Sequence, residues 1–238
     1  MSFVAVFYGL ALAHFIADYM QPAALVVWTK RNGGGLYVHT GIYAVLTAAV
    51  LYGSGPLWIP ALGVLTLSHF GFDWMKYRFS ARQKGNYLQW FLIDQACHGS
   101  VIVLIALVVA AQGGAPGWFV ALAFNNIDIL AIASAIIAAS FGGSILVFEA
   151  ARTLAPANDN RVISLKERLP GMLERTLACV FLFVSPWPWL TPLSFGYTGT
   201  RLAMGWQKPE SRRRTVEFVA SITGFLMAAA FYSVKGYA

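Results

Sequence analysis

The chain has 238 residues, of which 58% are hydrophobic and only 11% are charged, and its mean hydropathy is +0.62. Since an ordinary soluble domain is about 25% charged, this composition excludes an ordinary soluble domain and predicts an all-α, polytopic integral membrane protein. The net charge of +7 does not indicate nucleic-acid binding, because the basic residues are spread over several loops instead of forming one stripe.

Eight apolar segments of the sequence are candidates for membrane spans. The first has no basic region before it and no small-residue cleavage site after it, so we expect a span rather than a signal peptide. Three prolines, at positions 186, 188 and 192, interrupt the run between the sixth and seventh segments, and a re-entrant hairpin is the alternative there. The expected segments are 3–20, 36–52, 57–75, 87–111, 127–150, 172–184, 190–204 and 216–234.

The basic residues alternate between successive connections. Sixteen of the 17 Lys and Arg residues lie around the first, third, fifth and seventh connections, and only Lys235 lies elsewhere. The positive-inside rule therefore predicts that these connections are cytoplasmic and that both termini are external. The expected parts of the chain are a four-helix N-terminal half at 1–111, an external connection with the fifth helix at 112–151, a cytoplasmic linker at 152–171 and the C-terminal helices at 172–238.

Three pairs of histidine and aspartate, each four residues apart, lie in the first hundred residues. The pairs are His14 with Asp18, His69 with Asp73, and Asp94 with His98, and a fourth histidine, His39, opens the second segment. Residues four apart share a helix face, and the predicted topology puts all seven in the cytoplasmic half of a four-helix bundle. The insertion of one ionisable side chain into a membrane costs about 2.5–3.5 kcal/mol of free energy unless the side chain is paired or hydrated. We therefore expect the seven to form one site.

Imidazole nitrogens and carboxylate oxygens are ordinary ligands of zinc, iron and manganese, and helix bundles often hold such ions. The cluster therefore predicts a divalent metal ion, with zinc as one candidate. Asp18, Asp73 and Asp94 are expected to act as further ligands or as catalytic bases, and the surplus of ligands allows a second metal. The expected metal ligands are His14, His39, His69 and His98.

Other polar residues surround this predicted site. Lys76 follows Asp73 by three residues and is expected to neutralise an anionic substrate group in the catalytic site, while Gln21, Gln95 and Lys30 are expected to add hydrogen bonds at its rim. Two alternatives stay open for the cluster. One is a metal-free pathway for protons or ions, and the other is polar packing in which each pair satisfies itself.

Charged residues are sparser in the second half of the chain. Glu174 and Arg175 open the sixth segment, and Arg201 lies in the seventh. Interfacial anchors or interhelical salt bridges are the simplest interpretation of such residues near helix ends. A clamp for a phosphate or carboxylate group, built on Arg175 and Arg201, is the alternative.

Three motifs of the first half occur in order along the chain. They are AHFIADY at 13–19, followed by Gln21, Lys30 and His39, then SHFGFDWMK at 68–76 and FLIDQACH at 91–98. Together they resemble a bacterial membrane family known as domain of unknown function 3307, and LPGMLERTL at 169–177 resembles its C-terminal signature. The resemblance implies a helical protein of the bacterial inner membrane and implies no activity. A looser similarity exists to membrane-bound metal-dependent hydrolases.

The leading hypothesis is a metal-dependent hydrolase or lipid-modifying enzyme with its site at the cytoplasmic face, where an activated water attacks an ester, amide or phosphodiester. The alternatives are an accessory or scaffolding subunit of a membrane complex and an ion-coupled transporter. A transporter needs a polar path to the outer face, and the external halves of the first four segments are almost wholly apolar. The expected partners are membrane lipids and other membrane-protein subunits, and not nucleic acid.

Overall fold

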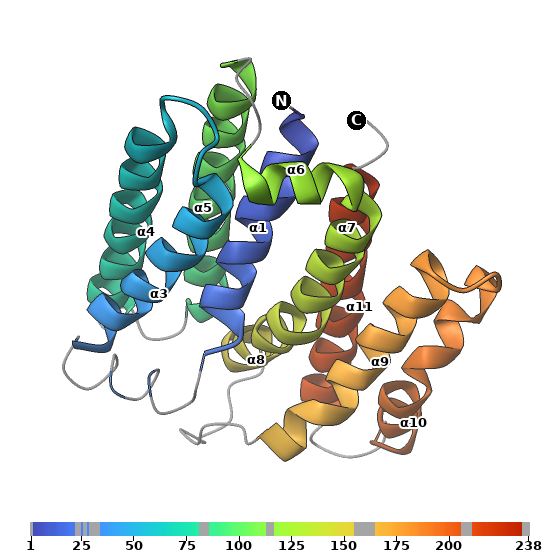
Figure 1. The fold of residues 1–238 in the computed structure, drawn as a ribbon. Coiled ribbons are helices and arrows are strands. Elements are labelled where there is room, and N and C mark those ends of the chain that lie inside the picture. The colour runs from blue at the N-terminus through green and yellow to red at the C-terminus, as the bar shows by residue number, and fades with distance from the viewer. Residues whose placement is uncertain are drawn as a thin grey trace. The chain divides into compact units, whose positions relative to one another are not determined.

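The computed structural model describes residues 2–21, 34–80, 86–112, 117–154, 165–205 and 211–234, together with Leu25 and Trp28. These residues are helical almost throughout and include no strand, which confirms the predicted all-α class (Figure 1). The elements are α1 (Phe3–Tyr19), α3 (Gly34–Leu51), α4 (Trp58–Ser80), α5 (Tyr87–Ala111), α6 (Trp118–Asn125), α7 (Ile127–Ile137), the π-helix η1 (Ala138–Gly142), α8 (Gly143–Leu154), α9 (Leu165–Phe183), the 3-10 helix η2 (Pro188–Phe195), α10 (Gly196–Gly205) and α11 (Ser211–Ser233).

The chain divides into two compact units, of which the first comprises Met1–Lys84, Leu92–Ser134 and Val234–Ala238. Within this unit α1 contacts α3 and α6, and α3 contacts α4. Residues 4–11 of α1 are all buried, without the alternation of buried and exposed faces that a surface helix shows. A helix that is apolar all round belongs in an interior, and α1 is therefore the central helix of the first unit.

The turn between α3 and α4 depends on glycine. Gly53 and Gly55 have φ values of 74° and 89°, a conformation that glycine adopts without the steric cost that other residues incur. A Cβ atom on Gly117 would collide with the carbonyl oxygen of Tyr52, so Gly117 also brings the start of α6 against this turn. These three glycines fix the α3–α4 hairpin, which carries four of the predicted site residues.

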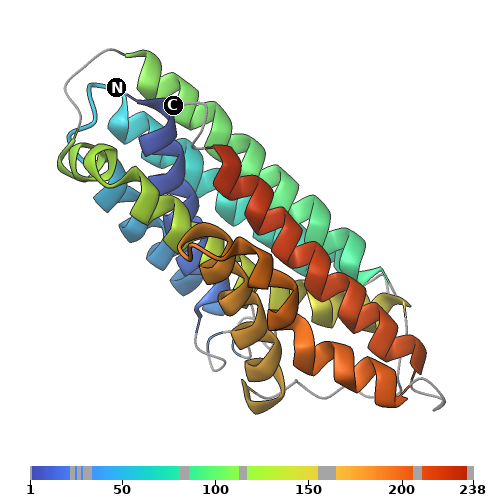
Figure 2. The same cartoon turned by 90° about the vertical axis from the view of Figure 1, so that its right-hand side faces the viewer.

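The second unit comprises Gly85–Phe91 and Ala135–Ser233. In it α11 packs on α8 and α10, and α9 packs on η1 and η2. Figure 2 shows α11, in red, as one uninterrupted helix. The buried core of this unit consists of Ala135, Ala139, Ala178, Cys179, Phe195, Phe225 and Ala228. Its small residues let the helices approach closely.

Four of the described helices are long and apolar enough to cross a membrane: Gly34–Leu51, Tyr87–Ala111, Ile127–Leu154 and Arg212–Ser233. This is compatible with a membrane protein, but it does not confirm the eight expected spans. Helix α1 is apolar and shorter, and α4 has 23 residues, but His69 and Asp73 lower its hydropathy. The expected seventh segment is divided into η2, which contains Pro192, and the ten-residue α10, which is about 15 Å long, half of a bilayer core.

Two connections differ from the sequence-based expectation. Residues 112–126 contain the helix α6, with the sequence WFVALAFN. The expected linker at 152–171, in which the sequence allowed a short amphipathic helix at 164–169, is helical at both ends, in α8 and α9. Residues 155–164 lie outside the described part of the chain. The four-part division of the chain stays a prediction.

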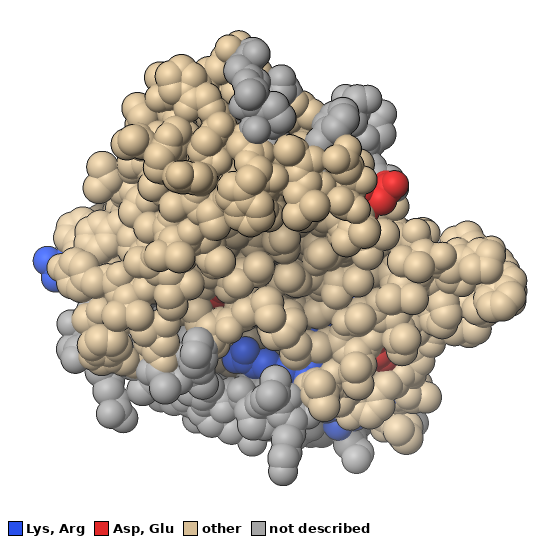
Figure 3. Space-filling view, viewed as in Figure 1, with Lys and Arg blue, Asp and Glu red and all other residues tan. Residues whose placement is uncertain are grey.

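The described surface carries many large apolar side chains. Val45, Leu67 and Leu193 are 70%, 73% and 70% exposed. On the face drawn in Figure 3, Lys, Arg, Asp and Glu occupy little of the described surface. Extended apolar surface of this kind marks contact with lipid or with another protein.

Candidate metal centre

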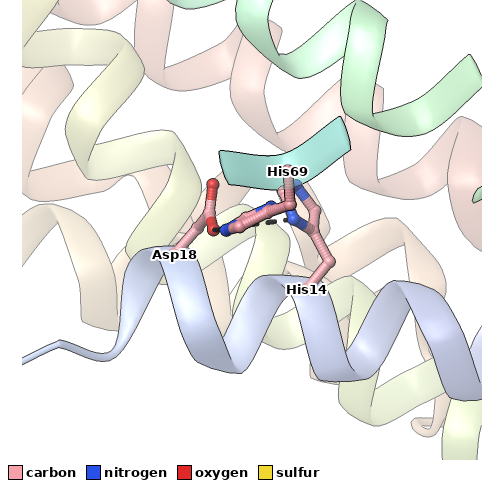
Figure 4. Close-up of side chains that lie close together, drawn as sticks. All are labelled: His14, Asp18 and His69. Carbon is pink, nitrogen blue, oxygen red and sulfur yellow. Dashed lines mark ion pairs between the residues drawn. The ribbon is translucent and has the colours of Figure 1, made fainter. Parts of the chain in front are cut away.

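Four helices of the first unit bring the seven predicted residues together. Helix α1 supplies His14 and Asp18, α3 supplies His39, α4 supplies His69 and Asp73, and α5 supplies Asp94 and His98. The four histidines and Asp94 are buried, and His69 is only 1% exposed. Figure 4 shows His14 and Asp18 of α1 facing His69 of α4. The roles assigned to these residues from the sequence stay predictions.

Three of the ligand atoms form a compact triangle, which we call the first triad: His39 Nε2, His69 Nε2 and Asp73 Oδ2. The two nitrogens are 2.9 Å apart, and they lie 2.8 and 3.3 Å from the Asp73 oxygen. Ligand atoms on a tetrahedral ion with bonds of about 2.0–2.1 Å are about 3.3 Å apart. Two imidazoles and one carboxylate are also the ligand set of many catalytic zinc and iron sites, which keep a coordination position open.

Asp18 lies beside the first triad. Its Oδ1 atom is 3.6 Å from His39 Nε2 and 3.5 Å from His69 Nε2. The same oxygen is 3.6 Å from Nδ1 of His14, one turn earlier on α1. Asp18 therefore lies between the first triad and His14.

Gln95 holds several of these side chains in place. Its Nε2 atom donates to Oδ2 of Asp94 at 3.0 Å and to Oδ2 of Asp18 at 3.5 Å. Its Oε1 atom accepts a hydrogen bond from the Tyr19 hydroxyl at 2.5 Å and lies 3.3 Å from His14 Nε2. An ionised carboxylate only accepts hydrogen bonds, so the two aspartates fix the amide orientation. The sequence prediction put Gln95 at the rim and missed Tyr19, because neither residue shares the helical spacing of the pairs.

The remaining predicted polar residues have different environments. Lys76 donates to Asp94 Oδ2 at 2.7 Å, and its side chain is 37% exposed while that of Asp94 is 2% exposed. The Gln21 amide hydrogen-bonds to His39 Nδ1 and to the carbonyl oxygen of Ala17. Lys30 lies outside the described residues. In this structure, Lys76 neutralises a carboxylate of the cluster.

Unpaired polar atoms concentrate in the cluster. Of the 13 buried side-chain nitrogen and oxygen atoms that lack a hydrogen-bond partner within the described structure, six belong to it. They are His14 Nδ1, Asp18 Oδ1, His69 Nδ1, Asp73 Oδ2, Asp94 Oδ1 and His98 Nε2. Buried polar groups normally have partners, and a bound cation satisfies lone pairs for which the protein offers no donor. Within the described part of the chain, the groups whose ligand atoms lie within 4.8 Å of one another are His14–Asp18–His69, His39–His69–Asp73 and Asp18–Asp94–His98.

Arg175, predicted as part of an anchor or an anion clamp, is buried in the second unit with 2% exposure. Its Nε atom donates to the Ala139 carbonyl at 2.6 Å, and its Nη2 atom donates to the Ser140 carbonyl at 3.2 Å. The hydroxyls of Ser144 and Ser221 accept from Nη2 and Nη1 at 2.7 and 2.8 Å. Since Ala139 and Ser140 lie in η1, the guanidinium joins α9 to the π-helix, α8 and α11.

Arg201 has a different environment from Arg175. Its side chain is exposed, and its guanidinium carbon lies 5.6 Å from the Tyr197 ring. Glu174, the neighbour of Arg175, accepts hydrogen bonds from the backbone and hydroxyl of Thr198. The described partners of the two guanidinium groups differ, and the clamp stays a prediction.

Residues 6–122 match the model of a family described as "Protein of unknown function (DUF3307)". The matched residues contain all seven residues of the cluster, whereas the 169–177 motif lies outside the match. No curated protein and no solved structure matches the chain. The match confirms the resemblance expected from the first-half motifs: residues 6–122 are similar to this family of proteins of unknown function.

Proposed function

We propose that the protein is a metal-dependent hydrolase, or a related lipid-modifying enzyme, of the bacterial inner membrane with its site near the cytoplasmic face. The observation that carries the proposal is the first triad. Its three ligand atoms lie 2.8–3.3 Å from one another in the interior of the first unit.

The distribution of polarity supports a membrane location. His69 is 1% exposed and Asp94 4%, whereas Val45 and Leu67 are 70% and 73% exposed, so the first unit buries ionisable residues of the cluster while it exposes large apolar side chains. The alternation of basic connections favours eight crossings with both termini external. In that topology the cluster lies near the cytoplasmic ends of its helices, within reach of substrates at the bilayer surface.

The triad would hold the ion through His39, His69 and Asp73, and a divalent ion bound there supplies electrophilic activation of a water molecule near neutral pH. When the triad alone holds an ion, Asp18 Oδ1, which is 3.5–3.6 Å from both imidazole nitrogens, is placed to accept the proton of that water. The water oxygen adds to the carbonyl carbon or phosphorus of the substrate, and the bond to the leaving oxygen breaks. The proton held by Asp18 then passes to the leaving oxygen.

Elemental analysis of detergent-purified protein, prepared without a metal-binding tag, tests the proposal. Turnover is measured on para-nitrophenyl butyrate and bis-para-nitrophenyl phosphate. We expect about one or more metal ions per chain and hydrolysis of at least one substrate in the wild type, and loss of both in His69→Ala. Asp128→Asn is the matched control, because it removes an exposed carboxylate outside the cluster, and it should retain both properties.

Two results would overturn the proposal. Folded His69→Ala that retains full metal content or full turnover would exclude the triad as the catalytic centre. Wild-type protein that stays metal-free after reloading, and copurifies stably with a defined membrane protein, would support the accessory-subunit alternative. The exposed apolar side chains of α3 and α4 are the observation that favours this alternative.

A further inference from the structure

We infer that the cluster binds a second divalent metal ion beside the first, through His14 Nδ1, His98 Nε2, Asp94 Oδ1 and the carboxylate of Asp18. The inference rests on the proposed function, because it assumes that the first triad holds the first ion. It is carried by the hydrogen-bond partners of these four side chains, each of which leaves one ligand atom facing the cluster.

His98 has a tautomer that its backbone contact determines. Its Nδ1 atom lies 2.9 Å from the carbonyl oxygen of Asp94, and a carbonyl only accepts hydrogen bonds, so Nδ1 carries the hydrogen. In a neutral imidazole the other nitrogen, Nε2, then presents a lone pair. That atom is buried and has no hydrogen-bond partner among the described residues. The His98 ring is thus prepared to bind a cation through Nε2.

The tautomer of His14 is also determined by its contacts, but here Nε2 carries the hydrogen and Nδ1 presents the lone pair. Its Nε2 atom lies 3.3 Å from Gln95 Oε1, the acceptor end of an amide that donates to Asp94 and Asp18. His14 Nε2 therefore carries the hydrogen, and Nδ1 presents a buried lone pair that no described donor satisfies. The His14 and His98 rings are stacked with centroids 4.9 Å apart, and Nδ1 of His14 lies 3.6 Å from Asp18 Oδ1, so Asp18 is next to both imidazoles.

Each of the two aspartates uses one carboxylate oxygen for the protein and leaves the other for a ligand. Asp94 Oδ2 accepts from Lys76 and Gln95, and Asp18 Oδ2 accepts from Gln95. Asp94 Oδ1 and Asp18 Oδ1 are buried and accept no hydrogen bond within the described part of the chain. Metal-binding carboxylates and imidazoles are typically oriented in this way by outer hydrogen-bond partners.

The second site is separate from the first triad but adjacent to it. Ligand atoms of Asp18, Asp94 and His98 lie within 4.8 Å of one another, in a different group from His39, His69 and Asp73. Asp18 Oδ1 is also 3.5–3.6 Å from the triad nitrogens, so Asp18 lies between the two groups as a bridging carboxylate does. The donors are imidazoles and carboxylates without a thiolate, which suits zinc, manganese or ferrous iron.

Charge balance then indicates the class of substrate. With all four imidazoles neutral, as the hydrogen bonds of His14 and His98 fit, one dication balances the three aspartates and Lys76. A second dication leaves net positive charge at the site, which an anionic substrate group neutralises. Two metal ions about 3.5–4 Å apart are the usual means of stabilising the transferred group in phosphate ester hydrolysis. A phosphate ester is therefore the substrate class that this arrangement fits.

The test is a titration of metal-depleted, detergent-purified protein with Mn²⁺, in which stoichiometry and the electron paramagnetic resonance spectrum are recorded. We expect two ions per wild-type chain and a spin-coupled spectrum. We expect one ion and the uncoupled six-line spectrum in His98→Gln. Cys97→Ser is the matched control at the neighbouring position of α5 and should keep two coupled ions.

The possible results distinguish a failure of the second metal site from a failure of the proposed function. One uncoupled ion in the wild type would overturn the second site and leave the single-metal hydrolase standing. Two ions in folded His98→Gln would also overturn the second site as assigned, and no ion in the wild type would overturn both proposals. Since the wild-type spectrum needs no substitution, the test holds if His98→Gln does not fold, and Asp94→Asn then serves as the second variant.

Discussion

Lys76 of α4 donates to Asp94 of α5 at 2.7 Å and is the cation next to a carboxylate that is 2% exposed. In Lys76→Met, Asp94 Oδ2 keeps only its hydrogen bond from Gln95, and losing a donor to a buried charged acceptor costs about 1–3 kcal/mol. A bound metal ion compensates part of this loss, because it binds the folded state alone. We therefore expect the Tm of Lys76→Met to fall more in metal-depleted than in metal-loaded protein.

The control for this prediction is Arg78→Met, which removes an exposed positive charge two residues further along α4. Its effect on Tm should be small and independent of metal. Thermal unfolding of the three proteins in detergent, with and without Zn²⁺, measures the difference. Equal losses of Tm in loaded and depleted Lys76→Met would mean that Asp94 does not contact the metal.

Gln95 orients Asp18, Asp94 and His14 without being a candidate ligand itself. Gln95→Leu removes two donors and one acceptor, so these side chains lose the partners that hold them toward the cluster. Losing an outer partner of a metal ligand typically weakens binding about 10–100-fold, and we expect that change in the metal dissociation constant. Tyr19→Phe leaves the Gln95 amide in place and should weaken binding less.

Competition with a chromogenic chelator measures these constants. Gln112→Leu is the matched control, since Gln112 accepts a hydrogen bond from the backbone of Leu57 outside the cluster. That variant should bind metal as the wild type does. An unchanged dissociation constant in Gln95→Leu would show that the carboxylates keep their positions without the amide.

The sequence predicted which histidines and aspartates form the cluster, but it did not predict all of the hydrogen bonds that orient them. A spacing of four residues predicts that His69 and Asp73 lie on the same face of a helix, because this follows from helix geometry and does not depend on how the helix packs. It carries no information on Tyr19 and Gln95, which meet only after α1 and α5 have packed. The π-helix around Ser140 was also missed, because its small residues show no distinct period. The prolines predicted an interruption between the sixth and seventh segments, but not the division of the seventh segment into η2 and α10.

Arg175 joins α9 to η1, α8 and α11 through four protein acceptors. In Arg175→Met these buried acceptors lose their donor, and we expect a loss of about 3 kcal/mol in the free energy of unfolding, since each unsatisfied group costs about 1–3 kcal/mol. Arg201→Met removes an exposed arginine and should change stability by less than about 0.5 kcal/mol.

Denaturant unfolding in detergent measures both Arg variants, with metal content recorded in parallel. Folded Arg175→Met should keep the metal content of the wild type, since its contacts lie in the second unit. Arg201→Met also tests the predicted anion clamp. If Arg201→Met raises the KM for a phosphate ester tenfold or more without a change in stability, the side chain contacts substrate.

Gly224 of α11 allows that helix to approach α8 closely. A Cβ atom at position 224 would lie 3.1 Å from the Cα atom of Gly143, and a Cβ on Gly143 would itself lie 2.8 Å from Arg175 Nε. The neighbour is helix backbone, so Gly224→Ala requires α8 and α11 to separate. We expect this cost to outweigh the gain of about 1 kcal/mol that alanine normally brings to a helix.

Gly199 of α10 is the matched control, because no described atom lies within 4 Å of a Cβ built there. We expect Gly199→Ala to raise Tm and Gly224→Ala to lower it, and thermal unfolding in detergent checks the opposite signs. Since the same substitution gains the same helix propensity at both positions, the difference in Tm isolates the contact between α8 and α11. A rise in Tm for both variants would mean that the two helices can separate at little cost.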